Sequence, residues 1–283
     1  MNESRPLLSF QISVDYPGHQ GVLRNVYLQI HSGETLGLVG ESGSGKSTIA
    51  LALLGLLSVK GAKVSGQVIF EDEDLLKKPE TQLRAIRGRR MSIVLQSPLA
   101  SLNPALRIGT QLKEAWQAHA LRGVAECGTA IRSALRSAQL PDDPEFLRRR
   151  PSQLSVGEAQ RVNIAMAILH RPALLIADEA TSALDTITQS EILDLFARLN
   201  RELHMAVLYI SHDLASVAAL CDRVAILYQG EIVETGATSD IFTSPTHSYT
   251  QRLLSAIPQA RAERSNEGAL TGANLRLVFG HSD

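Results

Sequence analysis

A nine-residue stretch, GESGSGKST at residues 40–48, constrains the fold of this chain more than any other feature. It fits the pattern G-x-x-x-x-G-K-[ST], which marks a phosphate-binding loop when a strand precedes it and a helix follows. Residues 35–39 form an apolar run of strand length, and residues 49–57 form an apolar, proline-free run that we expect to be helical. The setting therefore predicts a strand, a phosphate loop and a helix, which is an α/β core of the P-loop type. A flexible Gly/Ser linker is the alternative, but linkers do not end in Lys-Ser-Thr between a strand and a buried helix.

The loop's residue types suit a nucleoside triphosphate. Glycines let the backbone curl with its N–H groups inward, and the helix N-terminus adds partial positive charge. Lys46 is expected to reach the β- and γ-phosphates, and the Ser47 hydroxyl to ligate Mg²⁺. The nucleotide contacts expected here are Gly40, Ser42, Gly43, Ser44, Gly45, Lys46, Ser47 and Thr48.

Two acids follow a second apolar run. Residues 173–177 read as a buried strand, with Asp178 and Glu179 at its carboxyl end, where open α/β sheets bind ligands. We expect Asp178 to hold Mg²⁺ through its water shell and Glu179 to orient or deprotonate the water that attacks the γ-phosphate. An acidic pair at a strand end can instead cap the next helix, and that reading stays open here.

A third strand, residues 206–211, ends at His212. A lone histidine at a strand end is more often structural than catalytic. Because this one follows a strand end as the two acids do, we expect His212 to contact the γ-phosphate.

A mostly helical segment separates the two halves of the site. Residues 91–96 read as a strand that stops at Gln96, and the pattern from 108 to 150 is helical. A connection of that length is rarely a plain loop. We therefore predict a helical subdomain, about residues 97–150, inserted in the α/β core.

Composition excludes several other classes. The net charge is -1, so the chain has no overall positive charge that would attract nucleic acid, and we expect no nucleic-acid partner. The longest apolar stretch, residues 49–57, is far shorter than the ~20 residues that span a bilayer. Cys127 and Cys221 are isolated, which argues against a metal site and a disulfide framework. Without a signal-peptide pattern near residue 1, we expect cytoplasmic residence.

The ordered motifs resemble those of the ATP-binding-cassette (ABC) ATPases over roughly residues 8–240. They are GESGSGKST, Gln96, LSVGEAQRV, LLIADEA, SALD and YISHD. Within that superfamily, LQSPLASLNP and SPTHSYTQRLLSAIP resemble the ATPase subunits of bacterial oligopeptide, dipeptide and nickel importers.

The resemblance implies further roles. Tyr16 matches the aromatic residue that stacks on adenine, although a turn tyrosine packed beside Pro17 is the alternative. Gln96 matches the residue that senses the γ-phosphate and Mg²⁺, and Asp185 matches the acid at the dimer seam. In that family the helical insertion and the Gln96 segment form a groove for a short helix of a transmembrane permease.

The stretch LSVGEAQRV, residues 154–162, resembles the family's signature loop, which lies on the ATP of the partner subunit. The letters S-x-x-E at 155–158 also predict a capping box that opens a helix through His170. Both readings hold together, because free N–H groups at a helix N-terminus suit a γ-phosphate. The in-trans contacts expected are Ser155, Gly157, Glu158 and Asp185.

The signature departs from the usual LSGGQ pattern, since Val156 replaces the first glycine and Glu158 the glutamine. If Ser155 is the N-cap, Val156 falls at the first helical position, where its φ is negative and a β-branched residue fits. Gly157 keeps the bare backbone for phosphate. We therefore predict a working signature, and the extent to which these two changes weaken it stays open.

The overall prediction is an α/β P-loop ATPase of the ABC type, hydrolysing ATP with Mg²⁺ in a dimer that drives peptide import. Residues 1–240 would form the ATPase domain and 241–283 a C-terminal extension, with a mobile tail from about Gln259. The resemblance implies transmembrane permease subunits, an extracytoplasmic substrate-binding protein as an indirect partner, and a peripheral place on the cytoplasmic face of the bacterial inner membrane. Nickel or a metal chelate is the alternative cargo, and a homodimer and a heterodimer both stay open.

Rivals from other classes lack support in the sequence. ABC ATPases of DNA repair or chromosome structure are split by long heptad coiled coils, and no heptad run lies between Lys46 and Asp178. Translation-associated ABC proteins usually carry two cassettes, and this sequence has one phosphate loop. A P-loop kinase would leave residues 154–162 and His212 unexplained.

Overall fold

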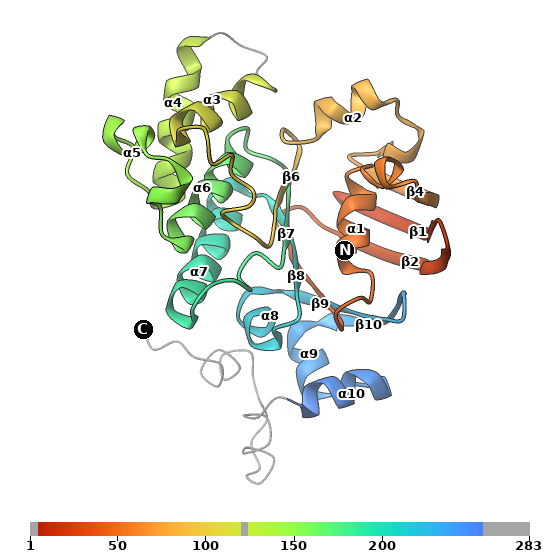
Figure 1. Cartoon of the computed structure of the whole chain (residues 1–283). Coiled ribbons are helices and arrows are strands. Elements are labelled where there is room, and N and C mark those ends of the chain that lie inside the picture. The colour runs from red at the N-terminus through yellow and green to blue at the C-terminus, as the bar shows by residue number, and fades with distance from the viewer. Residues whose placement is uncertain (1–4, 120–123, 257–283) are drawn as a thin grey trace. The chain divides into compact units, whose positions relative to one another are not determined.

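A computed structural model gives the fold of residues 5–119 and 124–256 (Figure 1). The chain divides into two compact units. The first combines the N-terminal part up to Leu76 with the part from Leu208 on, and the second is Lys77–Val207.

An antiparallel sheet opens the first unit (Figure 1). Its strands lie in the order β2-β1-β4-β5. Apolar and polar residues alternate along β1, so that one face packs inward, as strand geometry requires. The strands are β1 (Leu8–Tyr16), β2 (His19–Ile30), β4 (Lys63–Phe70) and β5 (Glu73–Asp74). β4 and β5 pair antiparallel in a short hairpin.

The other strands of this unit lie in the order β10-β9-β3-β8. β3 pairs in parallel with β9, and every residue of β3 is buried. A strand covered on both faces reads as a continuous apolar run, which is how the sequence showed it. The strands are β3 (Thr35–Val39), β8 (Ala206–Ser211), β9 (Arg223–Tyr228) and β10 (Glu231–Ala237). β9 and β10 pair antiparallel in a hairpin around Gln229 and Gly230.

Short helices complete the first unit. They are α1 (Lys46–Leu53), the 3₁₀ turn η1 (Leu57–Lys60), α8 (Leu214–Leu220), α9 (Thr238–Thr243) and α10 (Ser248–Ser255). The expected helix over residues 49–57 was wrong at its end, because α1 stops at Leu53. Gly55 then takes a φ of 62°, a left-handed conformation that ends a helix at little cost for glycine.

The second unit carries two parallel strands and most of the long helices. Strand β6 (Met91–Val94) pairs with β7 (Leu174–Asp178). The expected strand over 91–96 therefore ends two residues early, at Val94. The helices are α2 (Glu80–Ile86), α3 (Ile108–Gln117), α4 (Val124–Ser137), α5 (Pro144–Arg148), α6 (Val156–Ile168) and α7 (Thr186–Leu203), with a 3₁₀ turn at η3 (Pro151–Gln153). A further 3₁₀ turn, η2 (Leu75–Lys77), begins in the first unit and ends at the first residue of the second.

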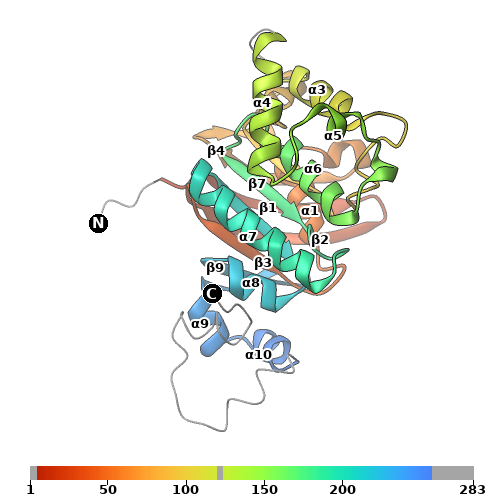
Figure 2. The same ribbon diagram turned by 90° about the vertical axis from the view of Figure 1, so that its left-hand side faces the viewer.

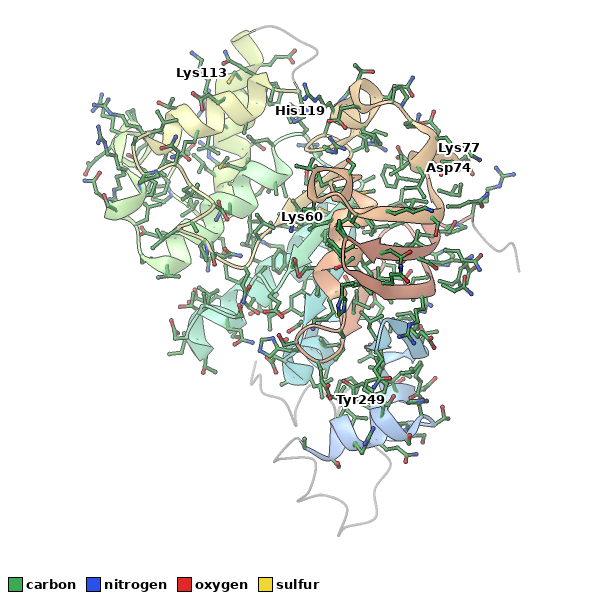
Figure 3. The ribbon with its side chains drawn as sticks, turned by 45° about the vertical axis from the view of Figure 1, so that its right-hand side comes forward. Lys60, Asp74, Lys77, Lys113, His119 and Tyr249 are labelled. Atoms are coloured by element: carbon green, nitrogen blue, oxygen red, sulfur yellow. The ribbon has the colours of Figure 1, made fainter. Side chains whose placement is uncertain are left out.

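Helices α3, α4 and α5 lie in the range 97–150, where the sequence predicts a helical insertion, and they gather around α6 (Figure 2). Where α3 ends, the Trp116 ring stacks on His170 with ring centroids 4.5 Å apart, and His119 meets His170 edge-on at 5.8 Å. Figure 3 shows His119 just beyond α3, the helix that carries Lys113. The aromatic cluster fixes the end of α3 against the segment that follows α6.

Both cysteines are buried and free, as expected of small apolar residues. Burial strongly raises the pKa of the Cys221 thiol. Across the described residues, no helix has the length and apolarity to cross a bilayer. The expected tail from Gln259 lies outside these residues.

Candidate nucleotide-binding site

The phosphate loop joins β3 to α1, as its sequence setting predicts. The Lys46 side chain is buried, and its Nζ donates hydrogen bonds to the carbonyls of Gly40 at 2.7 Å and Glu41 at 2.8 Å. The lysine thus lies inside the curve of the loop. A phosphate at the N-terminus of α1 would meet this ammonium group and free backbone N–H groups together.

Two of the loop glycines are required by close packing, and one of them, Gly45, also by its backbone conformation. A Cβ on Gly40 would lie 2.3 Å from the carbonyl oxygen of Leu227 in β9. Gly45 has a φ of 108°, and a Cβ there would lie 2.6 Å from Leu23 Cδ2. The sequence pattern predicted glycines here for backbone curvature, and the contacts with β9 and β2 add a packing requirement.

Tyr16, the expected adenine-stacking residue, ends β1 beside this loop. Its hydroxyl lies 3.4 Å from Thr48 Oγ1 in α1. A hollow of about 550 Å³ opens at the same strand end. Its lining residues are Asp15, Tyr16, Pro17, Gly18, Gln20, Gly61 and Lys63. The Tyr16 ring thus lies within reach of α1, as a base-stacking role would require. Pro17 lines the same hollow, so base stacking and a turn tyrosine packed beside Pro17 both stay predictions.

The two strand-end acids have different surroundings in the second unit. Asp178 is the last residue of β7 and is 8% exposed. Glu179 follows with a φ of 48°, a left-handed conformation that is unusual for a residue with a side chain. Gln96 Nε2 donates a hydrogen bond of 3.0 Å to Glu179 Oε2. The structure therefore brings together two residues that the sequence separates by 83 positions.

Neither of these acids caps a helix, so the alternative considered from the sequence was wrong. The next helix, α7, begins at Thr186 and has Asp185 as its N-cap. Asp185 accepts hydrogen bonds from the backbone N–H of Thr188 at 3.0 Å and from its hydroxyl at 2.7 Å. These bonds lower the pKa of the Asp185 carboxyl and hold it as an anion at the helix N-terminus.

The capping box at residues 155–158 is confirmed. Ser155 Oγ accepts a hydrogen bond from the backbone N–H of Glu158 at 3.1 Å, and Glu158 Oε2 accepts one from the backbone N–H of Ser155 at 2.8 Å. Val156 is the first residue of α6, with helical backbone and a side chain 40% exposed. The valine therefore fits without strain. The helix is two residues shorter than predicted and ends at Ile168 instead of His170.

His212 directly follows β8, in the first unit. The next residue, Asp213, is the N-cap of α8 and accepts a hydrogen bond from the backbone N–H of Ala215 at 3.0 Å. The backbone around His212 is thus held between a strand and a capped helix. This is the strand-end position that the sequence predicted for it.

Two buried amides on α6 escaped the sequence analysis. Gln160 Nε2 donates to the carbonyl of Ala180, just after Glu179, and Asn163 Nδ2 donates to the carbonyl of Pro98, just after Gln96, at 2.6 and 2.9 Å. The two amides thus anchor the segments that follow the hydrogen-bonded pair. Their signal is a pair of amides three residues apart among the apolar residues Ala159, Val162 and Ile164.

A P-loop with a buried lysine, and a separate strand end that carries a hydrogen-bonded glutamine and glutamate, define the class as a P-loop nucleoside triphosphatase of α/β fold. Residues 23–182 match the family model described as ABC transporter. Residues 233–277 match the model described as oligopeptide/dipeptide transporter, C-terminal region. The chain belongs to the ABC transporter ATP-binding family.

Three proteins similar to this chain are import or transport ATP-binding proteins by name. The chain is 42% identical over 274 residues to the glutathione import ATP-binding protein GsiA of Salmonella choleraesuis, covering 93% of this chain and 44% of GsiA. It is 41% identical to the oligopeptide transport protein OppD of Escherichia coli, covering 87% and 73% of the two chains. It is 40% identical to the dipeptide transport protein DppD of Bacillus subtilis, covering 94% and 77%. The chain thus spans less than half the length of the GsiA relatives.

Solved structures share the fold. CbiO1 from Clostridium perfringens, part of the ABC transporter complex cbiONQ, superposes with a TM-score of 0.74 at 23% identity, covering 90% of this chain and 97% of that one. A dimeric ATP-binding cassette, MJ0796 bound to ADP and Pi, gives a TM-score of 0.69 at 26% identity, covering 82% and 98%. The expected ABC-type fold class is confirmed.

Proposed function

We propose that this chain is the ATP-hydrolysing subunit of a bacterial ABC importer and that it drives the uptake of peptides. The observation that carries the proposal is the Gln96 to Glu179 hydrogen bond beside Asp178, in a chain whose phosphate loop holds a buried Lys46. This set supplies a lysine for phosphates, an acid for a metal ion, and a base joined to a sensor amide. Those are the parts that phosphoryl transfer to water requires.

The nucleotide would be held mainly by backbone N–H groups of the phosphate loop and by Lys46, with Tyr16 stacked on the base. The residues proposed for Mg²⁺ are Ser47, Gln96 and Asp178. Their donors are all oxygen atoms, the ligands that this cation prefers, so the residues fit the ion. When bound, Mg²⁺ would neutralise charge on the β- and γ-phosphates.

Hydrolysis then depends on three side chains of this chain. Glu179 accepts the proton of the attacking water, Gln96 orients the Glu179 carboxylate through the 3.0 Å hydrogen bond, and His212 donates to the γ-phosphate. The left-handed backbone of Glu179 turns the chain sharply at the end of β7. Strain of this kind is found where a side chain must be aimed.

A second ATPase subunit would complete each site. We place Ser155, Gly157, Glu158 and Asp185 on the nucleotide bound by the partner. The first turn of α6 offers backbone N–H groups, and the capping box holds the Glu158 carboxylate on the Ser155 backbone N–H. Its charge is thus directed to the helix cap, which limits repulsion of the γ-phosphate.

Peptide is the cargo that the relatives support. Their names give glutathione, oligopeptide and dipeptide transport, and glutathione is itself a peptide. The match of residues 233–277 to an oligopeptide/dipeptide transporter region points the same way. An ATPase subunit does not touch the cargo, so nickel or a metal chelate is the outcome that a transport assay must exclude.

We further propose that residues 1–240 form the ATPase domain, with 97–150 as its helical subdomain, and that 241–283 form the importer-type extension. The subunit would lie on the cytoplasmic face of the inner membrane, bound to permease subunits that a substrate-binding protein serves.

The test has three parts. Purified Glu179→Gln should bind Mg-ATP and hydrolyse it slowly, and its light-scattering mass should double with Mg-ATP if identical chains form the dimer. A mass that stays monomeric while nucleotide binds would point to a different ATPase partner. Co-expression with the neighbouring genes should then bring the wild-type chain into the membrane pellet. Cells that lack the gene should lose growth on a peptide but keep nickel uptake, and the reverse result would overturn the peptide assignment.

A further inference from the structure

Glu41, the second residue of the phosphate loop, is a centre of contacts within the loop. Its carbonyl oxygen accepts hydrogen bonds from Lys46 Nζ at 2.8 Å and from the backbone N–H of Ser44 at 3.1 Å. The curve of the loop therefore depends on where the Glu41 peptide lies. Neither of the donors comes from outside the loop.

Tyr249 of α10 lies near the beginning of the phosphate loop, because its ring stacks on Tyr228, the last residue of β9, and the carbonyl of the preceding Leu227 packs against Gly40. The side of α10 that carries Tyr249 lies toward β9 and β10 (Figure 3). Tyr249 is 3% exposed, and its buried hydroxyl makes no hydrogen bond of normal geometry to any of the described residues. Burial raises the pKa of the phenol, and the Glu41 carboxylate raises that pKa further, so the hydroxyl keeps its proton.

The ring of Tyr249 is fixed before any ligand binds. It stacks on Tyr228 with centroids 4.0 Å apart and planes inclined by 24°. Tyr228 ends β9, directly after Leu227, whose carbonyl packs against Gly40 of the loop. The tyrosine and the beginning of the loop therefore meet at the same strand end.

The N-terminus of α10 is fixed as well. His247 is its N-cap, with Nδ1 accepting a hydrogen bond from the backbone N–H of Tyr249 at 3.1 Å. The Glu234 carboxylate of β10 accepts bonds from the backbone N–H groups of Thr246 at 2.7 Å and His247 at 3.1 Å. A rigid path thus runs from β10 to the Tyr249 hydroxyl.

We propose that Tyr249 is a positioning residue for the phosphate loop, through which the C-terminal region sets the affinity for ATP. The inference rests on the proposed function. When Lys46 turns from the Gly40 and Glu41 carbonyls to the phosphates, the loop loses internal bonds. Tyr249 then donates a hydrogen bond to the Glu41 carboxylate and so keeps the Glu41 peptide in the curved conformation. A loop already ordered in this way binds its ligand at a smaller entropic cost.

The test is Tyr249→Phe in the full chain, which deletes the hydroxyl and keeps the stack on Tyr228. The KM and Kd for Mg-ATP should rise about three- to tenfold, the value of one hydrogen bond, with kcat within about twofold. The matched control is Tyr27→Phe, which removes the hydroxyl of a tyrosine that is 52% exposed on β2 and should change neither constant.

A double-mutant cycle with Glu41→Ala distinguishes positioning from general packing. If Tyr249 acts through Glu41, the KM of the double variant for Mg-ATP should equal that of the single variant that binds ATP less tightly, and should not exceed it. If the hydroxyl served only packing, Tyr249→Phe would lower Tm. Its affinity for nucleotide, measured about 20 °C below the lowered Tm, would then equal that of the wild type. Wild-type affinity in Tyr249→Phe, or effects that add fully, would overturn the inference while leaving the ATPase proposal intact. A wild-type chain that binds no nucleotide would defeat both.

Discussion

A Cβ on Gly157 would lie 2.8 Å from Cγ2 of Thr188. Thr188 is also the residue whose backbone N–H and hydroxyl bond the Asp185 carboxylate. The first turns of α6 and α7 are therefore packed at a glycine, and each turn carries residues that we propose to contact the partner's nucleotide. The glycine has a packing reason in addition to the phosphate reason that the sequence suggested.

Gly157→Ala should lower the free energy of unfolding by about 1 kcal/mol, because overpacking costs ~1–3 kcal/mol and the higher helix propensity of alanine returns up to ~1 kcal/mol. Thr188 cannot turn away freely, since its hydroxyl is bonded to Asp185. Urea unfolding measures the change. The double variant with Thr188→Ser, which removes Cγ2 and keeps the hydroxyl, should recover the loss; no recovery would show that the contact is not the cause.

Val156→Gly should leave the ATPase rate unchanged or raise it. The valine begins α6 and is 40% exposed, so its removal loses little packing and bares more backbone to a phosphate. Stability should fall by about 0.5–1 kcal/mol, the cost of glycine in a helix. Steady-state ATPase assays and urea unfolding check the two effects, and a large fall in rate would contradict the N-cap argument.

The backbone of Glu179 gives a prediction independent of catalysis. With a φ of 48°, this position favours glycine over a residue with a Cβ. The inactive variant Glu179→Gly should therefore be more stable than the equally inactive Glu179→Ala by about 0.5–1 kcal/mol, after the larger entropy of glycine in the unfolded chain is subtracted. Equal stabilities would mean that the left-handed turn does not hold in solution.

The stability of the second unit should fall in mild acid. Burial lowers the pKa of His170 and His119 below the usual 6.5, and His119 and Arg89 lower that of His170 further. The folded chain thus binds fewer protons than the unfolded chain near pH 6. The stabilisation is complete above the unfolded pKa of about 6.5 and is lost as pH falls from there toward the lowered folded values.

The measurement is the urea midpoint at pH 7.5 and pH 5.5. His170→Gln should reduce the difference between the two midpoints, whereas His204→Asn, which replaces an exposed histidine at the end of α7, should preserve it. An unchanged pH difference in His170→Gln would rule out this histidine as the cause.

The parts of the site that follow local rules could be predicted from the sequence. A phosphate loop needs only its own glycines and flanking elements, and the capping box at 155–158 needs only four consecutive residues. The strand-end positions of Asp178, Glu179 and His212 follow from apolar runs that stop there. The end of α1 was missed because Gly55 stands within an otherwise apolar run, whose periodicity gives no sign of a left-handed turn.

Contacts between distant segments could not be predicted in the same way. The bonds from Gln160 to Ala180 and from Asn163 to Pro98 depend on how α6 packs, as does the limit that Thr188 places on Gly157. No spacing in the sequence shows which helix face will be buried against which loop. The domain boundary at residue 240 and the roles of individual site residues stay predictions.

The stacked pair of Trp116 and His170 also gives the protein an internal optical reporter. Trp116 is the single tryptophan of the chain and lies in the second unit, while the phosphate loop lies in the first. Intrinsic fluorescence excited at the red edge therefore comes from the helical insertion alone. A change in that emission when nucleotide is added would show, without a label, that nucleotide binding at the phosphate loop alters the surroundings of Trp116 on α3.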